Sequence, residues 1–337
     1  MTLPTTEVTG SPMEPTVVPD RTAVASRSPM RLAAARFRKD YLSMIALAIV
    51  LFVVVAGILA PLLVSVGFLD PTSFNQELTD PTLGGIPTGG WSGISGDHWL
   101  GVEPSTGRDV LSRVWYGITF SLAIALSASI LAVGFGTAVG IVAGVSGGFA
   151  DSAIGRVIDL VLSFPSTLML LALSTPGIIF LDETLHVPAG PNKNFVNGLY
   201  VVLVLAAFGW PPVARLIRGQ VLSLREREFV EAARLMGASR FRLYFREILP
   251  NLWAPILVTF TITMPAYVSA EAALNFLGVG IIPPTPTLGN VLSASLNWAS
   301  ADPFFFFAPA FIIMTIVLSF NLLGDGLRDA LDPKGDR

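Results

Sequence analysis

Apolar residues gather in six long stretches along the chain, and polar segments between them carry the charged residues. The stretches are residues 42–66, 121–145, 160–180, 194–214, 252–270 and 303–323. An α-helix needs about 20 predominantly apolar residues to cross the hydrocarbon core of a bilayer, and each stretch has about that length. The pattern therefore predicts an all-α, polytopic membrane protein with six transmembrane helices.

The basic residues predict how these helices are oriented, because cytoplasmic loops are enriched in Lys and Arg. With both chain ends inside, 18 of the 21 Lys and Arg residues fall on the cytoplasmic side, eight of them between the fourth and fifth stretches. Arg108, Arg113 and Lys193 fall on the outside. This distribution predicts that both termini are cytoplasmic.

The polar segments divide the chain. Residues 1–40 are rich in Pro, Ser and Thr and end in a basic run, which predicts a disordered cytoplasmic tail. The first transmembrane helix, 41–66, starts too far along the chain for a cleaved signal and is interpreted as an anchor. An extracytoplasmic segment, 67–113, precedes a core of five transmembrane helices, 114–324, and a cytoplasmic tail, 325–337. Within the core, the proline-rich interval 272–301 is expected to be an outer loop.

Composition excludes several kinds of site. Charged residues make up 13% of the chain, against about 25% in an average soluble domain. The absence of Cys excludes disulfides, Cys-ligated zinc and iron–sulfur clusters. With only two His, at His98 and His186, a histidine metal site is not expected, and we assign no catalytic residue or bound cofactor.

The predicted spans lack the usual signs of ion-coupled transport. Their centres contain no ionisable residue, and Asp159 and Glu271, near span ends, are interpreted as interfacial or loop residues. The six stretches do not repeat as two similar halves, and there is no Walker A pattern for ATP hydrolysis by the chain itself. Energy must therefore come from a partner or a gradient. An ion-coupled secondary transporter and a membrane-embedded enzyme are alternatives that these observations disfavour.

The cytoplasmic loop 215–251 is the most informative polar segment. Within its sequence REREFVEAARLMGASRFRLYFREILPN, apolar residues recur at i, i+3, i+4 and i+7, which predicts an amphipathic helix. The predicted apolar face comprises Phe229, Ala232, Ala233 and Met236. Glu231 lies on the other side, where it can meet Arg227 or Arg234.

A second short helix is predicted directly after the first. Gly237 can take the left-handed conformation that ends a helix, and Ser239 can cap the next one. The same apolar spacing recurs at Phe241, Tyr244, Phe245 and Ile248. Pro250 is then expected to begin the next membrane helix, because proline is favoured in the first turn of a helix.

Two interpretations of this helix pair differ in what it touches. The eight arginines of the loop 215–251 suit a basic helix that lies on the inner leaflet. Small Ala232 and Ala233, in the middle of the apolar face, suit close docking on another protein.

The loop also resembles a known motif. Glu231-Ala232-Ala233, then Gly237 six places after the glutamate and Pro250 nineteen places after it, resembles the EAA loop of ABC importer permeases. The isoleucine stands directly before Leu249 rather than one place earlier, which is a small departure also common in the peptide-permease branch.

Other segments resemble the C-type subunit of dipeptide and oligopeptide permeases. They are HWLG (98–101), GRDVLSR (107–113), FLGVG (276–280) and NLLGDGLRD (321–329). Val102-Glu103 replaces the usual Thr-Asp, and one extra residue precedes Gly107. The resemblance covers about residues 30–335 and places the chain with the inner-membrane permeases of the dipeptide, oligopeptide and nickel family.

The resemblance implies the type I ABC importer permease fold, in the bacterial cytoplasmic membrane. It also implies a heteromeric importer with a second homologous permease, two ATPase subunits that bind ATP and Mg²⁺, and an extracytoplasmic substrate-binding protein. No nucleic acid is implied. Peptides are the expected substrate, with nickel, glutathione or another small solute as the alternative within the family.

Residue roles follow from the matched motif positions. The residues expected to couple the chain to an ATPase subunit are Phe229, Glu231, Ala232, Ala233, Met236, Gly237, Leu249 and Pro250. Gly237 is expected to act as a backbone corner. His98 and Arg108 are candidates for contact with the binding protein or a peptide carboxylate, although a role in the structure of the outer segment is favoured for both.

Overall fold

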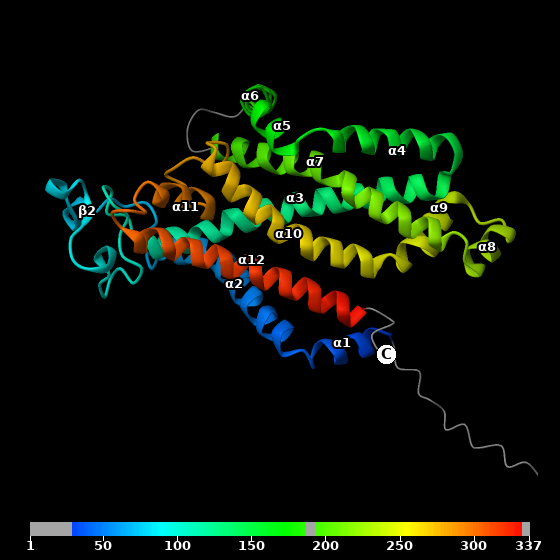
Figure 1. Cartoon of the computed structure of the whole chain (residues 1–337), viewed down its shortest axis with the longest axis horizontal. Helices are drawn as coiled ribbons and strands as arrows, with labels where there is room; N and C mark the ends of the chain where they lie inside the picture. The colour runs from blue at the N-terminus through cyan, green and yellow to red at the C-terminus, as the bar shows by residue number, and fades with distance from the viewer. Residues whose placement is uncertain (1–28, 187–192, 332–337) are drawn as a thin grey trace, which may run out of the picture.

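The longest helix of the computed structural model, α3 (Val110–Ser146), runs through the middle of the bundle and packs against most of the other long helices (Figure 1). The structure describes residues 29–186 and 193–331. In chain order the other helices are α1 (Pro29–Phe37), α2 (Tyr41–Ser65), α4 (Gly148–Ser163), α5 (Ser166–Ala172), α6 (Ser174–Leu185), α7 (Lys193–Leu224), α8 (Glu228–Leu235), α9 (Arg240–Arg242), α10 (Trp253–Phe276), α11 (Leu288–Leu296) and α12 (Pro303–Leu331).

Shorter elements fill two connections. Between α2 and α3 lie the 3-10 helices η1 (Gln76–Leu78), η2 (Pro81–Leu83) and η3 (Trp91–Gly93), and strand β1 (Thr79–Asp80) pairs antiparallel with β2 (Ile86–Pro87). Between α9 and α10 lie the π-helix η4 (Leu243–Ile248) and the 3-10 helix η5 (Leu249–Asn251).

Within the described residues, five helices are long and apolar enough to cross a membrane: α2, α3, α7, α10 and α12. They confirm helices at five of the six predicted stretches. A continuous third span over 160–180 is wrong, because α4 ends at Ser163 and α5 follows after a bend of 73°. Pro165 has no amide hydrogen and keeps Phe164 extended, so the helix cannot continue. If α4 and α5 form one broken span, the spans number six.

Several helices run beyond their predicted ends. α3 begins inside the predicted outer segment, because the Asp109 side chain accepts a hydrogen bond from the Ser112 amide at 2.7 Å and caps the helix. α7 continues into the predicted loop 215–251, and α12 continues into the predicted tail. Disorder is wrong for Pro29–Phe37, which is helix α1 packed against α12. Residues 1–28 and 332–337, also placed in predicted tails, lie outside the described residues.

Glycines let α3 and α7 approach each other closely. Gly136, Gly140 and Gly144 recur every four residues and so lie on one face of α3. A Cβ added at Gly136 would lie 2.7 Å from the Trp210 carbonyl oxygen, and one at Gly140 would lie 2.7 Å from that of Ala214. Small residues at such spacing are typical of tightly packed membrane helices, because they bring the two backbones into direct contact.

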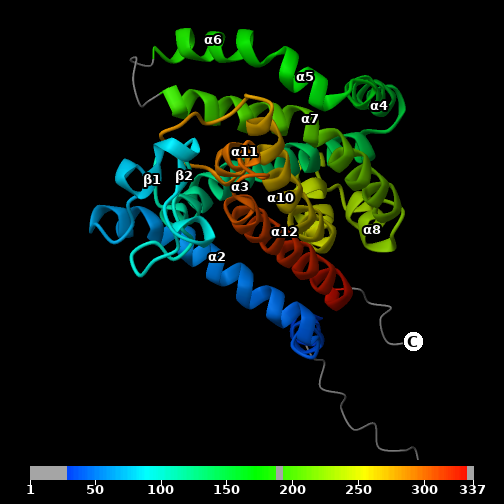
Figure 2. The ribbon, with the colours of Figure 1, turned by 60° about the vertical axis from the view of Figure 1, so that its left-hand side comes forward.

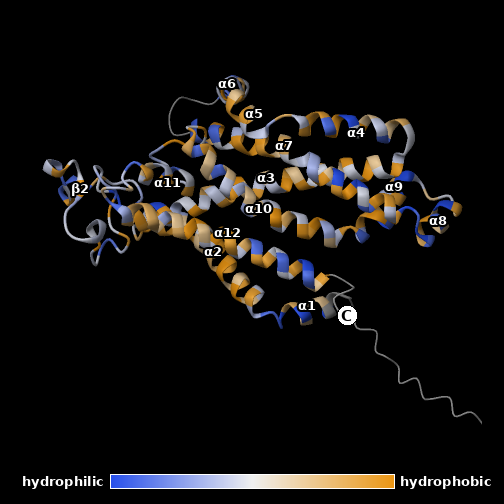
Figure 3. Ribbon diagram, in the orientation of Figure 1, coloured by the Kyte–Doolittle hydropathy of each residue, from blue (hydrophilic) through white to orange (hydrophobic). Residues whose placement is uncertain are grey.

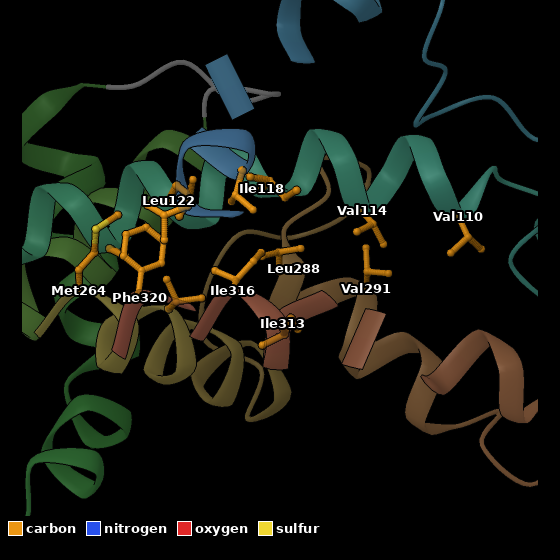
Figure 4. Close-up of a cluster of buried hydrophobic side chains, with 14 of the residues drawn as sticks. Val110, Val114, Ile118, Leu122, Met264, Leu288, Val291, Ile313, Ile316 and Phe320 are labelled. Carbon is orange, nitrogen blue, oxygen red and sulfur yellow. The ribbon is translucent and has the colours of Figure 1, made fainter. Parts of the chain in front are cut away.

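Apolar packing joins the remaining helices to α3. One cluster comes from α2, α3, α10, α11 and α12, and its side chains interlock between α3 and the pair α11 and α12 (Figure 4). Its labelled members include Val110, Val114, Ile118, Leu122, Leu288, Val291, Ile316 and Phe320. Lipid is as apolar as these side chains, so close packing rather than removal from water stabilises such a cluster within a membrane.

The interval 272–301 is only partly the predicted loop. α10 continues to Phe276, and α11 begins after Thr287, whose side chain and that of Asn290 form a capping box. Glu271, interpreted from the sequence as an interfacial or loop residue, is instead fully buried in α10. Its carboxylate accepts hydrogen bonds from the Ser121 hydroxyl at 2.8 Å and from the Asn275 side chain.

The two ends of the bundle differ. The segment with β1 and β2 lies at one end, and α8 lies at the other, on the side where α1 and the last turns of α12 are also found (Figures 1 and 2). Apolar residues predominate along the long helices between, and hydrophilic residues are frequent in α8 and at the outer segment (Figure 3).

Replacing Gly140 with Ala is expected to destabilise the bundle by about 1–3 kcal/mol, since its Cβ would overlap the α7 backbone. Gly134→Ala is the matched control on the same helix, because a Cβ at Gly134 meets no atom within 4 Å. The measurement is the thermal unfolding midpoint of the purified chain in detergent. Gly140→Ala should have the lower midpoint, and equal midpoints for the two variants would contradict the close approach of α3 to α7.

Candidate functional site

The connection between α7 and α10 folds as a turn of short helices. Arg227 is extended and α8 follows, ending at a corner where Gly237 has a φ of +77°. The Ala238 amide donates to the Ala233 carbonyl at 3.0 Å, which closes the end of the helix. The predicted helix and its glycine corner are therefore confirmed.

The second helix differs from its prediction in type. Ser239 is the predicted cap and accepts a hydrogen bond from the Arg242 amide at 3.3 Å. After α9, however, the chain continues as the π-helix η4. Its two buried residues are Leu243 and Ile248, which lie five positions apart. Phe241 and Phe245, expected on one apolar face with Ile248, are exposed instead, with ring centroids 4.5 Å apart.

The inner face of α8 is fixed to the bundle. Val230 and Ala233 are buried and belong to a hydrophobic cluster with residues of η4, α3 and α7. The members from those elements include Val133, Ile141, Val213, Ile217, Val221, Leu243 and Ile248. Ala233, predicted as a docking residue, therefore packs inside the molecule, in a cluster that α8 shares with η4, α3 and α7.

The outer face of α8 is open. Phe229 is 41% exposed and Met236 is 76% exposed, and Ala232 is also exposed. Leu235, 85% exposed, belongs to the same surface but was missed, because it falls outside the spacing used to predict the apolar face. We call Phe229, Ala232, Leu235 and Met236 the outer patch of α8.

Charged and terminal residues of the loop complete the site. Glu231 is exposed and forms no ion pair with any described residue, so the expected contact with Arg227 or Arg234 is not made. Leu249 is partly buried in η5, and Pro250, beside it, is exposed. Pro250 stands in the first turn of η5, directly before α10, as its position in the sequence predicts.

His98 has a structural position in the outer segment. Its Nδ1 lies 2.9 Å from a carboxylate oxygen of Asp109, the residue that caps α3. The imidazole thus orients the cap of the central helix, and its side chain is 20% exposed.

Arg108 is buried in the same segment. Its Nε donates to the Glu103 carboxylate at 2.6 Å, and its guanidinium lies over the Phe74 ring at 5.4 Å. Arg113, fully buried in α3, faces the same carboxylate at 3.6 Å. Arg108 is only 8% exposed, so in this conformation it is not free to contact a binding protein or a peptide.

No group of three or more His, Asp or Glu that could hold a metal ion occurs among the described residues. The candidate site is therefore an exposed patch on a short helix whose inner face packs into a cluster with residues of α3 and α7.

Two family models match the sequence. Residues 136–336 match the binding-protein-dependent transport system inner membrane component, and residues 28–81 match the N-terminal transmembrane domain of oligopeptide transport permease C. Together they include α2, α7, α10 and α12, and the last part of α3 from Gly136 onward.

Curated relatives are similar over most of the chain. A dipeptide transport system permease protein from Alkalihalophilus pseudofirmus is 36% identical over 95% of both chains. An oligopeptide transport system permease protein from Mycobacterium tuberculosis is 34% identical over 90% of this chain and 94% of its own. A glutathione transport system permease protein from Pectobacterium atrosepticum is 38% identical over 72% of this chain and 74% of its own.

A solved structure shares the fold. The MetNI methionine ABC transporter in an inward-facing conformation matches with a TM-score of 0.51 and 18% identity. The match covers 66% of this chain and 96% of that one.

Gly237→Ala tests the corner of the loop. A side chain at a φ of +77° costs about 1–2 kcal/mol, although a Cβ there meets no atom within 4 Å, so the cost is purely conformational. We expect faster proteolytic cleavage between α8 and η4 than in wild type. Gly219→Ala, an equally open glycine within α7, is the control and should be cleaved at the wild-type rate. Equal cleavage of both variants would show that the left-handed corner does not hold the loop.

Proposed function

The chain belongs to the family of binding-protein-dependent transport system inner membrane components, and we propose that it is a permease subunit of an ABC importer for dipeptides or oligopeptides. The observation that carries this proposal is the two-sided helix α8. Its inner face packs into a cluster with residues of η4, α3 and α7, and its outer patch is exposed.

The proposed topology has six spans with both termini in the cytoplasm. The broken pair of α4 and α5 supplies the sixth span. The placing of 18 of the 21 Lys and Arg residues on one side supports this orientation. The outer segment between α2 and α3 then faces the substrate-binding protein, and α8 faces the cytoplasm.

The loop 215–251 is proposed to couple ATP hydrolysis to the switching of the pore between inward and outward access. We expect Phe229, Ala232 and Met236, with Leu235, to fill a groove on an ATPase subunit, and Glu231 to orient α8 by pairing with a basic residue there. Gly237 shapes the corner, and Ala233, Leu249 and Pro250 connect the docked helix to the bundle. Closure of two ATPase subunits on ATP and Mg²⁺ would move α8, and α3 and α7 would move with it.

The complete importer contains a second homologous permease, two ATPase subunits and an extracytoplasmic substrate-binding protein. The chain therefore supplies half of the pathway and leaves hydrolysis to separate subunits. We propose the bacterial cytoplasmic membrane as its location, which the description of the family as an inner membrane component supports.

Peptides are favoured over other solutes because the dipeptide permease relative aligns with a larger share of this chain than the glutathione permease relative does. The dipeptide permease relative aligns over 95% of this chain, whereas the glutathione permease relative aligns over 72%. The buried Glu271 does not favour an ion-coupled transporter. Ser121 and Asn275 engage its two carboxylate oxygens, as in a structural polar cluster rather than an ion path.

Purification of the tagged chain in mild detergent tests the importer. We expect a second permease and two ATPase chains to be recovered with it, and the preparation to hydrolyse ATP. Mass spectrometry identifies the subunits. Recovery of the chain alone, under conditions that keep known importers whole, would contradict the proposal.

Glu231→Lys tests the coupling role. Reversing a charge at a docked surface should lower peptide uptake by about tenfold or more, with the chain still assembled in the membrane. Glu183→Lys, an identical charge change on the exposed surface of α6, should transport normally. Normal uptake by Glu231→Lys would remove this residue from the coupling surface.

A further inference from the structure

A basic pocket lies where α3 ends and the chain passes from α7 into α8. Its volume is about 550 Å³, and Gly147 and Ser146 at the end of α3 line one side of it. Arg225 follows α7, Arg234 lies in α8 and Arg240 lies in α9, so three different elements each bring one arginine to it. Glu226 is the acidic residue that also lines the pocket.

These arginines differ from three others at the same end of the molecule. Arg215 pairs with Asp159, Arg218 pairs with Asp151, and Arg242 lies 3.8 Å from Glu247. Each of those three cations is thus matched by a carboxylate within the chain.

The pocket arginines are not matched. Arg225 donates to the Gly144 carbonyl at 3.1 Å, which fixes its guanidinium at the end of α3. The side chains of Arg234 and Arg240 have neither an ion-pair nor a hydrogen-bond partner among the described residues. With one carboxylate against three guanidinium groups, the pocket has an excess of positive charge and many unused N–H donors.

This donor set suits a phosphate group. A guanidinium presents a planar fork of N–H donors that matches the oxygens of a phosphate, and it keeps its charge at any physiological pH. The volume is within the usual range for a small-molecule site, about 300–1,000 Å³, which accommodates a phosphate group with its substituent.

A neighbouring apolar residue points to the membrane as the source of that group. Phe149 is the second residue of α4, two positions after Gly147, and is 89% exposed. Large exposed apolar and aromatic side chains beside a charged rim are typical of the level where acyl chains meet headgroups. Basic pockets between membrane helices on the cytoplasmic side bind anionic headgroups.

We propose that Arg225, Arg234 and Arg240 form a binding site for the phosphate group of an anionic ligand, supplied by a phospholipid of the cytoplasmic leaflet. The assignment of the leaflet rests on the orientation proposed above. The site itself does not depend on the transported substrate. A bound headgroup would join the ends of α3, α7 and α8, at the place where docking of the outer patch of α8 has to be transmitted to the bundle.

The test uses the purified chain with its co-purifying subunits in nanodiscs of equal phosphatidylglycerol and phosphatidylcholine. Native mass spectrometry after detergent extraction counts the phosphatidylglycerol molecules retained. The double variant Arg234→Gln with Arg240→Gln should retain about tenfold less than wild type. The control double variant Arg227→Gln with Arg246→Gln removes the same charge from exposed positions of the same loop and should stay within about twofold of wild type.

A second arm uses inorganic phosphate with the protein in phosphatidylcholine alone. If phosphate raises the unfolding midpoint of wild type but not of the pocket variant, and phosphatidylglycerol is not retained, the site stands with a soluble anion as its ligand. Equal lipid loss in both double variants would reduce the effect to general surface charge and overturn the proposal. Unchanged lipid retention with loss of the ATPase subunits from the pocket variant would also overturn it, since the arginines would then serve that contact.

Discussion

The direct contact between the backbones of α3 and α7 is the constraint on which the rest of the structure depends. Gly136, Gly140 and Gly144 remove the side chains that would separate the two helices, and a Cβ at any of the three would come within 2.7 Å of α7. Once the helices lie this close, the remaining faces of α3 are available to α2, α10 and α11. Because α7 continues past the predicted membrane stretch to Leu224, the same contact also sets where the following loop begins.

That rigid pair explains how a helix of eight residues can carry a mechanical role. Isolated helices of this length are not stable in water, so α8 needs tertiary contacts to exist. Val230 and Ala233 provide them on one side, by packing into the cluster that contains Ile217 and Val221 of α7. The opposite side, with Leu235 and its neighbours, makes no comparable contact within the described chain. A short helix held on one face and free on the other is suited to pass the movement of a partner to the helices behind it.

The sequence predicts what local signals determine and misses what neighbouring elements determine. The corner at Gly237 is predicted correctly because glycine readily takes the left-handed conformation that this corner requires. Five spans are predicted correctly because their length and apolar composition are sufficient evidence. The prediction of the exposed face of α8 is only half right, because periodicity identifies an apolar stripe but not the part of it that another element covers. Ala233 is buried, whereas Leu235 is exposed. Pro165 is a helix-breaking residue, but the apolar length around it predicts a continuous span. The burial of Glu271 has no local signal, because its partner Ser121 is 150 residues away.

The placement of charge differs between the two ends of the bundle, and the difference has a physical consequence. In and near the outer segment, Glu103 is shared by Arg108 and Arg113, and all three are nearly or fully buried. Removing one member of a buried ion pair costs about 3–5 kcal/mol, so this end is held in a single arrangement by its own residues. At the other end, Arg234 and Arg240 face a pocket with their donors unused. A cation left unsatisfied by its own chain gains most from a ligand or partner, which supports the anion site proposed for that end.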